Sequence, residues 1–238
     1  VVKTKNELYD FIRNKNGKVF VNRDNELLME LSNGIDSHTY GKDNKADIEA
    51  NIVSSNPYLI INWEGNEIKT NLVGDYNFEN VMAAISVGCY FNIEKSLIIE
   101  ALENYTPTNN RSQYIKSEKN EIVMDAYNAN PVSMHHAIKN FRNISSENTL
   151  LILGDMRELG KDSEKEHQTI INLIKELKFE NVMLVGNEFK KAAAGTDFAT
   201  FTNVEELLAF INDNDISGKK ILIKGSNSIN LKSIVNVL

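Results

Sequence analysis

The chain has a single cysteine among its 238 residues, Cys89, which lies in an apolar stretch at 83–91. One thiol can form neither an internal disulfide nor a cysteine-based zinc cluster, so the sequence predicts a protein of a reducing compartment, the cytoplasm. A free cysteine in apolar surroundings usually behaves as a small hydrophobic residue. We therefore expect Cys89 to belong to the core and not to act as a reactive thiol.

Long apolar and long basic runs are also missing. No apolar run approaches the roughly 18 residues that a membrane-spanning helix needs, and the first five residues do not have the pattern of a signal peptide. The formal net charge is −7, which makes nucleic acid an improbable partner. Because the chain opens as though in the middle of a helix, we expect it to be a piece of a longer protein.

Two nucleotide-binding motifs are absent from the sequence. There is no Gly-x-Gly-x-x-Gly, which disfavours a Rossmann-type dehydrogenase. There is also no Gly-x-x-x-x-Gly-Lys followed by Ser or Thr, which excludes a complete P-loop ATPase within this chain.

The first part of the chain, residues 1–105, mixes helical and strand patterns. We expect, in order, an amphipathic helix through Leu8, Phe11 and Ile12, a strand at 18–22, a hairpin of strands 58–63 and 67–73 that turns at Gly65-Asn66, and helices at 77–91 and 94–104. A polar stretch with one proline, 106–110, follows and is the predicted linker.

The second part, residues 106–238, alternates strands and helices. The predicted strands are 121–125, 149–153, 181–185, 199–202 and 220–224, and a helix at 163–179 is predicted to open with a capping box of Ser163 and Glu166. Such alternation produces right-handed crossovers and a parallel sheet with helices on both faces. We therefore predict an α/β fold with a doubly wound, mostly parallel, Rossmann-like sheet domain.

Ligands bind such sheets at the carboxyl ends of the strands, so the residues that end the predicted strands are the candidate site. These residues are Asp125, Gly154-Asp155, Gly186-Asn187, Thr202-Asn203 and Lys224-Gly225-Ser226. The alternative for each is an ordinary polar loop, since strand ends meet loops in any fold.

Three of these turns carry the most chemistry. A carboxylate such as Asp125 can accept both hydroxyls of a ribose, while Asn130 before Pro131 is a good helix cap, and a capping role alone is the alternative for it. The glycine-bounded turn 154–160 is charged, and the lysine, hydroxyl and amide donors at 224–228 suit a carboxylate or a phosphate. His167 lies near an apolar helix face and is predicted to be a partly buried structural residue. The adjacent His135 and His136 cannot both face one metal.

Three segments resemble motifs of the Mur ligases, and of the MurF branch in particular. Residues 125–131 with Ser133 and Met134 resemble its D-S/A-Y-N-A-N-P-x-S-M signature, residues 154–160 its G-D-M-x-E-L-G motif, and residues 224–226 its K-G-S motif. Residues 74–80 are similar to its G-x-H-N-x-x-N motif, and residues 3–9 to the segment that holds its carbamylated lysine, aligned at Lys5. The resemblance covers essentially the whole chain.

The resemblance implies a three-domain ligase whose front part is missing here. Residues 1–105 would be the C-terminal portion of the central ATP-binding domain, without its P-loop, and residues 106–238 the C-terminal ligase domain. The implied reaction uses ATP and Mg²⁺ to activate the carboxylate of UDP-N-acetylmuramoyl-tripeptide as an acyl phosphate, which the amine of D-alanyl-D-alanine then attacks. The implied protein is a monomer, and this chain alone would be inactive.

Carried over by position, the resemblance also implies roles for individual residues. Asn80 would contact adenine, Asp125 the ribose, and Arg111 the ribose or phosphates of the nucleotide. Lys5, as a carbamate, would help to hold Mg²⁺. The alternative for Lys5 is an ordinary exposed lysine on a surface helix. The residues expected to face the dipeptide or acyl phosphate are Asn128, Asn130, Asp155, Arg157, Lys224 and Ser226, with Lys5, Lys224 and Asp155 counted as catalytic.

The sequence departs from the pattern at two positions and leaves two other functions open. Tyr76 stands where the family usually has histidine, and Arg157 fills a variable site of its motif. The D-N-P-R motif of the diaminopimelate-adding relatives is absent, which favours the MurF branch. The alternatives are a folylpolyglutamate synthase-like ligase, which shares the architecture, and a non-catalytic nucleotide-binding α/β module.

Overall fold

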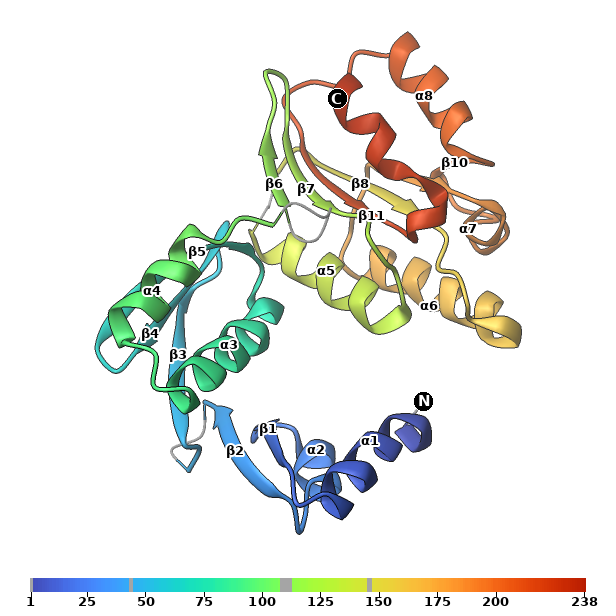
Figure 1. The fold of residues 1–238 in the computed structure, drawn as a ribbon. Helices are drawn as coiled ribbons and strands as arrows, with labels where there is room; N and C mark the ends of the chain where they lie inside the picture. Colours follow the sequence, from blue (N-terminus) through green and yellow to red (C-terminus); the bar gives the residue numbers. More distant parts are fainter. Residues whose placement is uncertain (1, 43–44, 108–112, 145–146) are drawn as a thin grey trace. The chain divides into compact units, whose positions relative to one another are not determined.

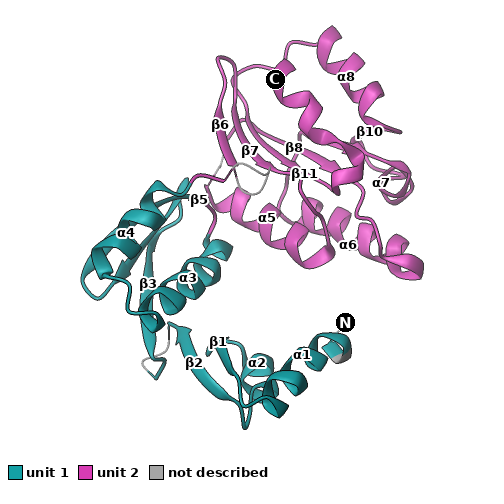
Figure 2. Cartoon of the chain, viewed as in Figure 1, with its two compact units in different colours: residues 1–71, 75–105 teal, residues 72–74, 106–238 magenta. Residues whose placement is uncertain are grey.

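The computed structural model describes residues 2–42, 45–107, 113–144 and 147–238, and the chain divides into two compact units (Figures 1 and 2). Unit 1 consists of residues 1–71 and 75–105, and unit 2 of residues 72–74 and 106–238.

Unit 1 is built on a five-stranded sheet with the order β1-β2-β3-β4-β5. Its elements are α1 (Val2–Asn14), β1 (Lys18–Asn22), α2 (Glu26–Leu31), β2 (Asp36–Gly41), β3 (Ile48–Ser54), β4 (Tyr58–Trp63), β5 (Asn66–Val73), α3 (Phe78–Tyr90) and α4 (Lys95–Asn104). The pairs β1–β2 and β2–β3 are parallel, whereas β3–β4 is antiparallel. Helix α3 packs against the strands β1, β2 and β3.

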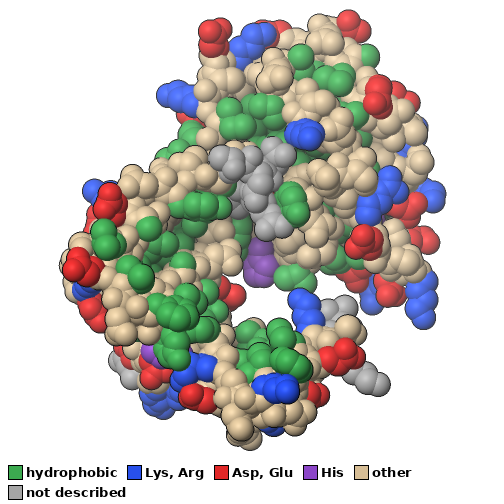
Figure 3. Space-filling model, viewed as in Figure 1, with side chains coloured by type: hydrophobic (Ala, Val, Ile, Leu, Met, Phe, Trp, Pro, Cys, Tyr) green, Lys and Arg blue, Asp and Glu red, His purple; other side chains and the backbone are tan. Residues whose placement is uncertain are grey.

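The helix α1 packs differently from the sequence pattern. Tyr9 and Ile12 contact a small core cluster formed by Val19, Val21 and Ile35. Leu8 and Phe11, which the pattern placed on the same face as Ile12, are each 61% exposed, and hydrophobic side chains are visible on this part of the surface (Figure 3). The packing face of α1 is therefore narrower than its apolar face.

Two local predictions in unit 1 need correction. The hairpin between β4 and β5 turns at Glu64 and Gly65, both with positive φ (47° and 79°), and not at Gly65-Asn66. Asn66 already belongs to β5, and its side-chain amide donates to the carbonyls of Trp63 and Glu64. Cys89 is only partly buried, and this partial burial raises the pKa of its thiol.

Unit 2 contains a six-stranded sheet with the order β10-β9-β8-β11-β7-β6. Its elements are β6 (Gln113–Lys116), β7 (Glu121–Asp125), α5 (Pro131–Ile144), β8 (Thr149–Gly154), α6 (Ser163–Glu176), β9 (Val182–Val185), α7 (Asn187–Ala192), β10 (Ala199–Phe201), α8 (Val204–Asp213) and β11 (Lys220–Lys224), with short 3₁₀ turns at Gly160–Asp162, Asn227–Ile229 and Leu231–Val237. All strand pairs are parallel except β6–β7.

Helices cover both faces of this sheet. Helices α5 and α6 pack together on one face, while α8 and the C-terminal 3₁₀ segment lie on the other (Figure 1). The core on the α8 side joins alternate residues of the central strands, such as Ile122, Ile152 and Ile223, to Leu207 and Ile234. The predicted α/β fold with a mostly parallel, doubly wound sheet is confirmed.

Two details of unit 2 were not predicted correctly. The edge strand β6 was not recognised, because four residues carry too little periodicity to stand out. The capping box is wrong: the 3₁₀ turn Gly160–Asp162 runs directly into α6, so Ser163 already has helical torsions and its hydroxyl bonds to Glu188.

Candidate active site at the carboxyl edge of the unit 2 sheet

The strand order brings distant residues together at one edge. Strand β11 lies between β7 and β8, so Lys224 is in register with both Asp125 and Leu153. The ends of these three strands and the turns after them hold most of the site residues predicted in unit 2, whereas Gly186-Asn187 and Thr202-Asn203 follow the strands β9 and β10. Parallel strands end at the same edge, where backbone and side-chain groups are free to meet a ligand.

Asp125 and Lys224 form a buried ion pair. The Nζ of Lys224 lies 2.5 Å from Oδ2 of Asp125 and also donates to the carbonyl of Asn128 at 3.3 Å. The side chains are 2% and 13% exposed for lysine and aspartate. The sequence predicts two separate ligand-binding groups, whereas in the structure they form one ion pair that anchors the turn after β7.

That turn leads directly into α5 and exposes two amide side chains. Oδ1 of Asn130 accepts the N–H of Ser133 at 2.8 Å, so Asn130 caps α5 and Pro131 is its first residue, as predicted. Oδ1 of Asn128 accepts the adjacent N–H of Ala129 at 2.8 Å. The side chains of Asn128 and Asn130 are exposed at the sheet edge and can meet a polar ligand.

The turn after β8 uses its carboxylate to hold another helix. Asp155 is 1% exposed, and its oxygens accept the N–H groups of Glu188 (3.2 Å) and Phe189 (2.9 Å) at the start of α7. The resemblance implied a catalytic role for Asp155. The contacts seen here give it a structural role, because both oxygens accept amides of a helix end that have no partner within the helix.

Gly186 makes this contact possible. It has a φ of +118°, and a Cβ at this position would lie 2.2 Å from the carboxylate carbon of Asp155. In the sequence, Gly186 stands out only as the end of a predicted strand. Its requirement for glycine comes from Asp155, 31 positions away in the numbering, and no local pattern signals it.

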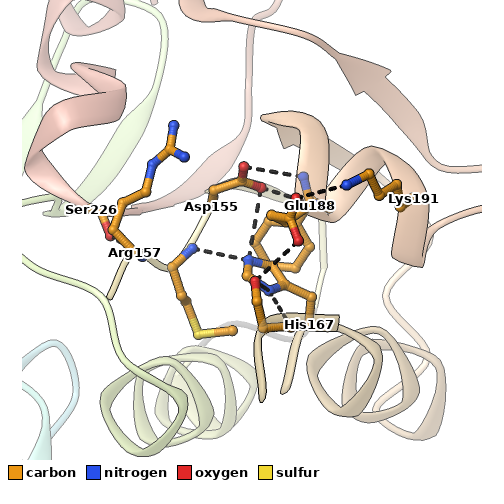
Figure 4. A network of polar contacts seen from close by, with 9 residues as sticks. Asp155, Arg157, His167, Glu188, Lys191 and Ser226 are labelled. Carbon is orange, nitrogen blue, oxygen red and sulfur yellow. Dashed lines mark hydrogen bonds and ion pairs between the residues drawn. The ribbon is translucent and has the colours of Figure 1, made fainter. Parts of the chain in front are cut away.

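The turns after β8 and β11 bind each other through the backbone. The N–H of Ser226 donates to the carbonyl of Asp155 at 3.2 Å, and Oγ of Ser226 accepts the N–H of Arg157 at 2.9 Å (Figure 4). The strands approach so closely here that a Cβ on Gly225 would lie 3.0 Å from Cα of Gly154. Ser226 therefore orders the turn, while the guanidinium of Arg157 is exposed.

A second polar network lies behind the turn, around His167 and Glu188. His167 was predicted to be partly buried and structural, and it is fully buried, 0% exposed. The carboxylate of Glu188 accepts from Nζ of Lys191 and from the hydroxyl of Ser163, and these two hydrogen bonds, the lysine's first, lower the pKa of Glu188.

The predicted residues of unit 1 are at the surface. Asn80 is exposed in the first turn of α3, where its amide donates to Oδ1 of Asn77 at 3.1 Å. Lys5 is an exposed residue of α1. Arg111, together with 108–110 of the predicted linker, lies outside the described residues.

The described residues contain neither a candidate membrane span nor a metal-binding cluster. None of their helices combines the length and apolarity needed to cross a bilayer. In the same ranges, no group of three or more His, Cys, Asp or Glu side chains is arranged to hold a metal ion.

Two family models match the chain and together account for most of it. Residues 1–88 match the Mur ligase middle domain, and residues 110–227 match the domain described as Mur ligase, glutamate ligase domain.

Two relatives with similar sequences bear the name UDP-N-acetylmuramoyl-tripeptide–D-alanyl-D-alanine ligase. The protein of Bacillus subtilis is 29% identical over 225 residues, which cover 90% of this chain and 49% of that protein. The protein of Buchnera aphidicola subsp. Baizongia pistaciae is 32% identical over 252 residues, covering 100% of this chain and 54% of its own length. The chain thus spans about half the length of these relatives.

Solved structures agree on the fold. MurF from Acinetobacter baumannii superposes with a TM-score of 0.78 at 21% identity, covering 93% of this chain and 51% of that one. Folylpolyglutamate synthase from Mycobacterium tuberculosis superposes with a TM-score of 0.63 at 13% identity, covering 92% of this chain and 55% of that one. Because ligases of different substrates share this fold, the fold does not distinguish them. The family models and the sequence relatives carry the assignment: this chain belongs to the Mur ligase family.

Proposed function

We propose that this chain is the nucleotide- and acceptor-binding part of an ATP-dependent amide ligase that joins D-alanyl-D-alanine to UDP-N-acetylmuramoyl-tripeptide. The observation that carries the proposal is the carboxyl edge of the unit 2 sheet, where Lys224 pairs with Asp125 and Ser226 accepts the N–H of Arg157. The side chains of Asn128 and Arg157 are exposed at this edge. Relatives that bear this activity in their names align over 90–100% of the chain, which supports the choice of substrate.

The chemistry requires positioning and charge neutralisation more than covalent help from the protein. ATP phosphorylates the carboxylate of the tripeptide, the amine of the dipeptide attacks the acyl carbon, and the tetrahedral intermediate expels phosphate to leave the amide. Protein groups lower such barriers by holding the reactants in line and balancing negative charge. The exposed guanidinium of Arg157 suits the carboxylate of the dipeptide, since arginine pairs with carboxylates in a bidentate manner.

Lys224 has a different role in this proposal from that of a free cation. Its charge is balanced by Asp125, and its second contact is the carbonyl of Asn128. It therefore positions the turn that carries Asn128 and Asn130, so that these amides face the reactants.

The side chains that this chain offers to a ligand suit the nucleoside of ATP better than they suit Mg²⁺. Asn80 offers an exposed amide of the kind that reads adenine, and Asp125 a carboxylate of the kind that holds ribose hydroxyls. For the metal, the resemblance assigns Lys5, as a carbamate, and the described residues contain no group of three or more His, Cys, Asp or Glu side chains that could hold the ion.

The test is a ligation assay on a protein in which a P-loop-bearing segment precedes residue 1. With ATP and UDP-N-acetylmuramoyl-tripeptide, we expect phosphate release and amide formation with D-alanyl-D-alanine and not with single L-amino acids. Extension of a folate by glutamate would instead establish the folylpolyglutamate synthase-like alternative. Nucleotide binding without turnover on any acceptor would favour the non-catalytic module.

A further inference from the structure

His167 is a buried histidine that the proposed chemistry does not use. It lies in the second turn of α6 and is 0% exposed, with its ring edge-on to Phe189 of α7 at a centroid distance of 4.7 Å (Figure 4). Buried polar groups are hydrogen-bonded, so both ring nitrogens of this imidazole are expected to have partners. These partners show which nitrogen carries a proton.

The partners determine which nitrogen carries the proton. Nε2 lies 3.0 Å from the backbone N of Met156, an obligatory donor, so Nε2 must be the bare acceptor. Nδ1 lies 2.7 Å from the carbonyl of Ser163, an obligatory acceptor, so Nδ1 must carry the hydrogen. His167 is therefore a neutral imidazole in the Nδ1–H form.

The charged groups around the ring do not change this assignment. Oδ1 of Asp155 is 3.8 Å from Nε2, beyond hydrogen-bond distance, and already accepts from Phe189. Glu188 reaches the ring only through the hydroxyl of Ser163, and Lys191 is paired with Glu188.

The amide that His167 holds belongs to the turn at the proposed site. Met156 is followed by Arg157, whose N–H donates to Oγ of Ser226. Two consecutive amides of the turn are thus fixed from opposite sides, one by α6 and one by the end of β11. The rest of the turn includes Glu158 and Gly160, both with positive φ (65° and 55°), and does not impose this position by regular structure.

We propose that His167 is a positioning residue for the ligase reaction: through Nε2 it sets the place of the Met156–Arg157 peptide, and with it the exposed guanidinium, at the acceptor edge. The functional consequence rests on the function proposed above. The hydrogen-bonding role itself does not, and it can be measured on this chain without any reaction.

Two substitutions of His167 distinguish the hydrogen bond accepted by Nε2 from the packing of the side chain in the core. Glutamine places its amide oxygen near the position of Nε2 and can still accept from Met156, whereas asparagine reaches only as far as Nδ1. In His167→Asn we expect hydrogen exchange at the Met156 amide to accelerate about tenfold or more, and in His167→Gln we expect most of the protection to return. His136→Asn, the same change at an exposed position of α5, serves as the matched control.

Nitrogen NMR of the imidazole tests the tautomer directly, and amides of β8 and β11 report whether the core itself loosens. An Nε2–H tautomer would overturn the proposal. So would unchanged exchange at Met156 in His167→Asn, or equal acceleration at Met156 and at the strand amides, since either result would leave His167 a packing residue only.

The kinetic test uses the P-loop-bearing protein. His167→Asn should lower kcat/KM for the dipeptide about tenfold and leave the Michaelis constant for ATP nearly unchanged, with partial rescue by His167→Gln. Equal loss for both substrates would contradict a role at the acceptor edge. If the parent protein ligates no dipeptide while the exchange results hold, the proposed function fails and the hydrogen-bonding role of His167 stands.

Discussion

At the scale of single residues, the Asp125–Lys224 ion pair determines how a substitution of either residue affects stability and ligand binding. Each charge is compensated by the other in a buried place, where an unpaired ion is costly. Removal of either partner therefore acts first on the stability of unit 2 and only then on a ligand. A loss of activity in one variant would not by itself identify a ligand contact.

We predict that Asp125→Asn and Lys224→Met each lower the free energy of unfolding by about 3–5 kcal/mol, because each leaves one buried charge unpaired. The double variant should cost clearly less than the sum of the two, since it leaves neither charge behind. Chemical denaturation followed by circular dichroism measures all three.

The exposed pair Lys119–Asp215, at 3.2 Å, supplies the control, and Lys119→Met is expected to change stability far less because water screens both charges. Additive losses in the Asp125 and Lys224 variants would show that the two side chains do not depend on each other.

At the scale of elements, the start of α7 depends on Gly186 and Asp155 together. We predict that Gly186→Ala destabilises the chain by roughly 3 kcal/mol or more, because the added methyl meets the Asp155 carboxylate in a backbone region that is open essentially to glycine alone. Gly218→Ala is the matched control: its φ is +66°, but a Cβ there meets no atom within 4 Å, so only about 1–2 kcal/mol of backbone strain is expected. Similar thermal shifts in both variants would argue against the steric explanation.

The same helix should contribute a pH-dependent share of stability through Glu188. Hydrogen bonds from Lys191 and Ser163 lower its pKa in the folded chain, so its stabilising contribution is complete above about 4.3, the usual pKa of an unfolded glutamate, and is lost as the pH falls through the folded value. Glu188→Gln should flatten the decline of stability below that pH. Unfolding curves between pH 6 and pH 3 test this, and parallel declines in parent and variant would refute it.

At the scale of the whole molecule, the two units do not include a phosphate-binding loop of the P-loop type. We predict that this chain by itself releases no phosphate from ATP, with or without Mg²⁺, because no glycine-rich loop cradles the β- and γ-phosphates. A phosphate-release assay measures this, with the P-loop-bearing protein as the positive control. Magnesium-dependent hydrolysis by the chain alone would contradict the prediction.

Some elements were predictable because their signals are local. Strands β7 and β11 have the bounds that their apolar runs predict, and Asn130 caps α5 as its position before Pro131 indicates. Such features depend on periodicity and on torsion preferences of neighbouring residues. The predictions were wrong for the edge strand β6 and for the start of α6. The local signal of β6 was weak, and that of α6 was overridden by the 3₁₀ turn that precedes the helix.

The sequence by itself determined the α/β class, the residue types at the strand ends and the motifs that resemble the Mur ligases. Tertiary structure alone decided which of these residues touch. Lys224 meets Asp125 across 99 positions because β11 inserts between β7 and β8, and Asp155 caps α7 because β9 lies beside β8. Local sequence patterns do not predict strand order, because strand order depends on the burial of whole sheet faces and on crossovers between distant segments. For that reason the residue types at the site could be predicted, and their contacts could not.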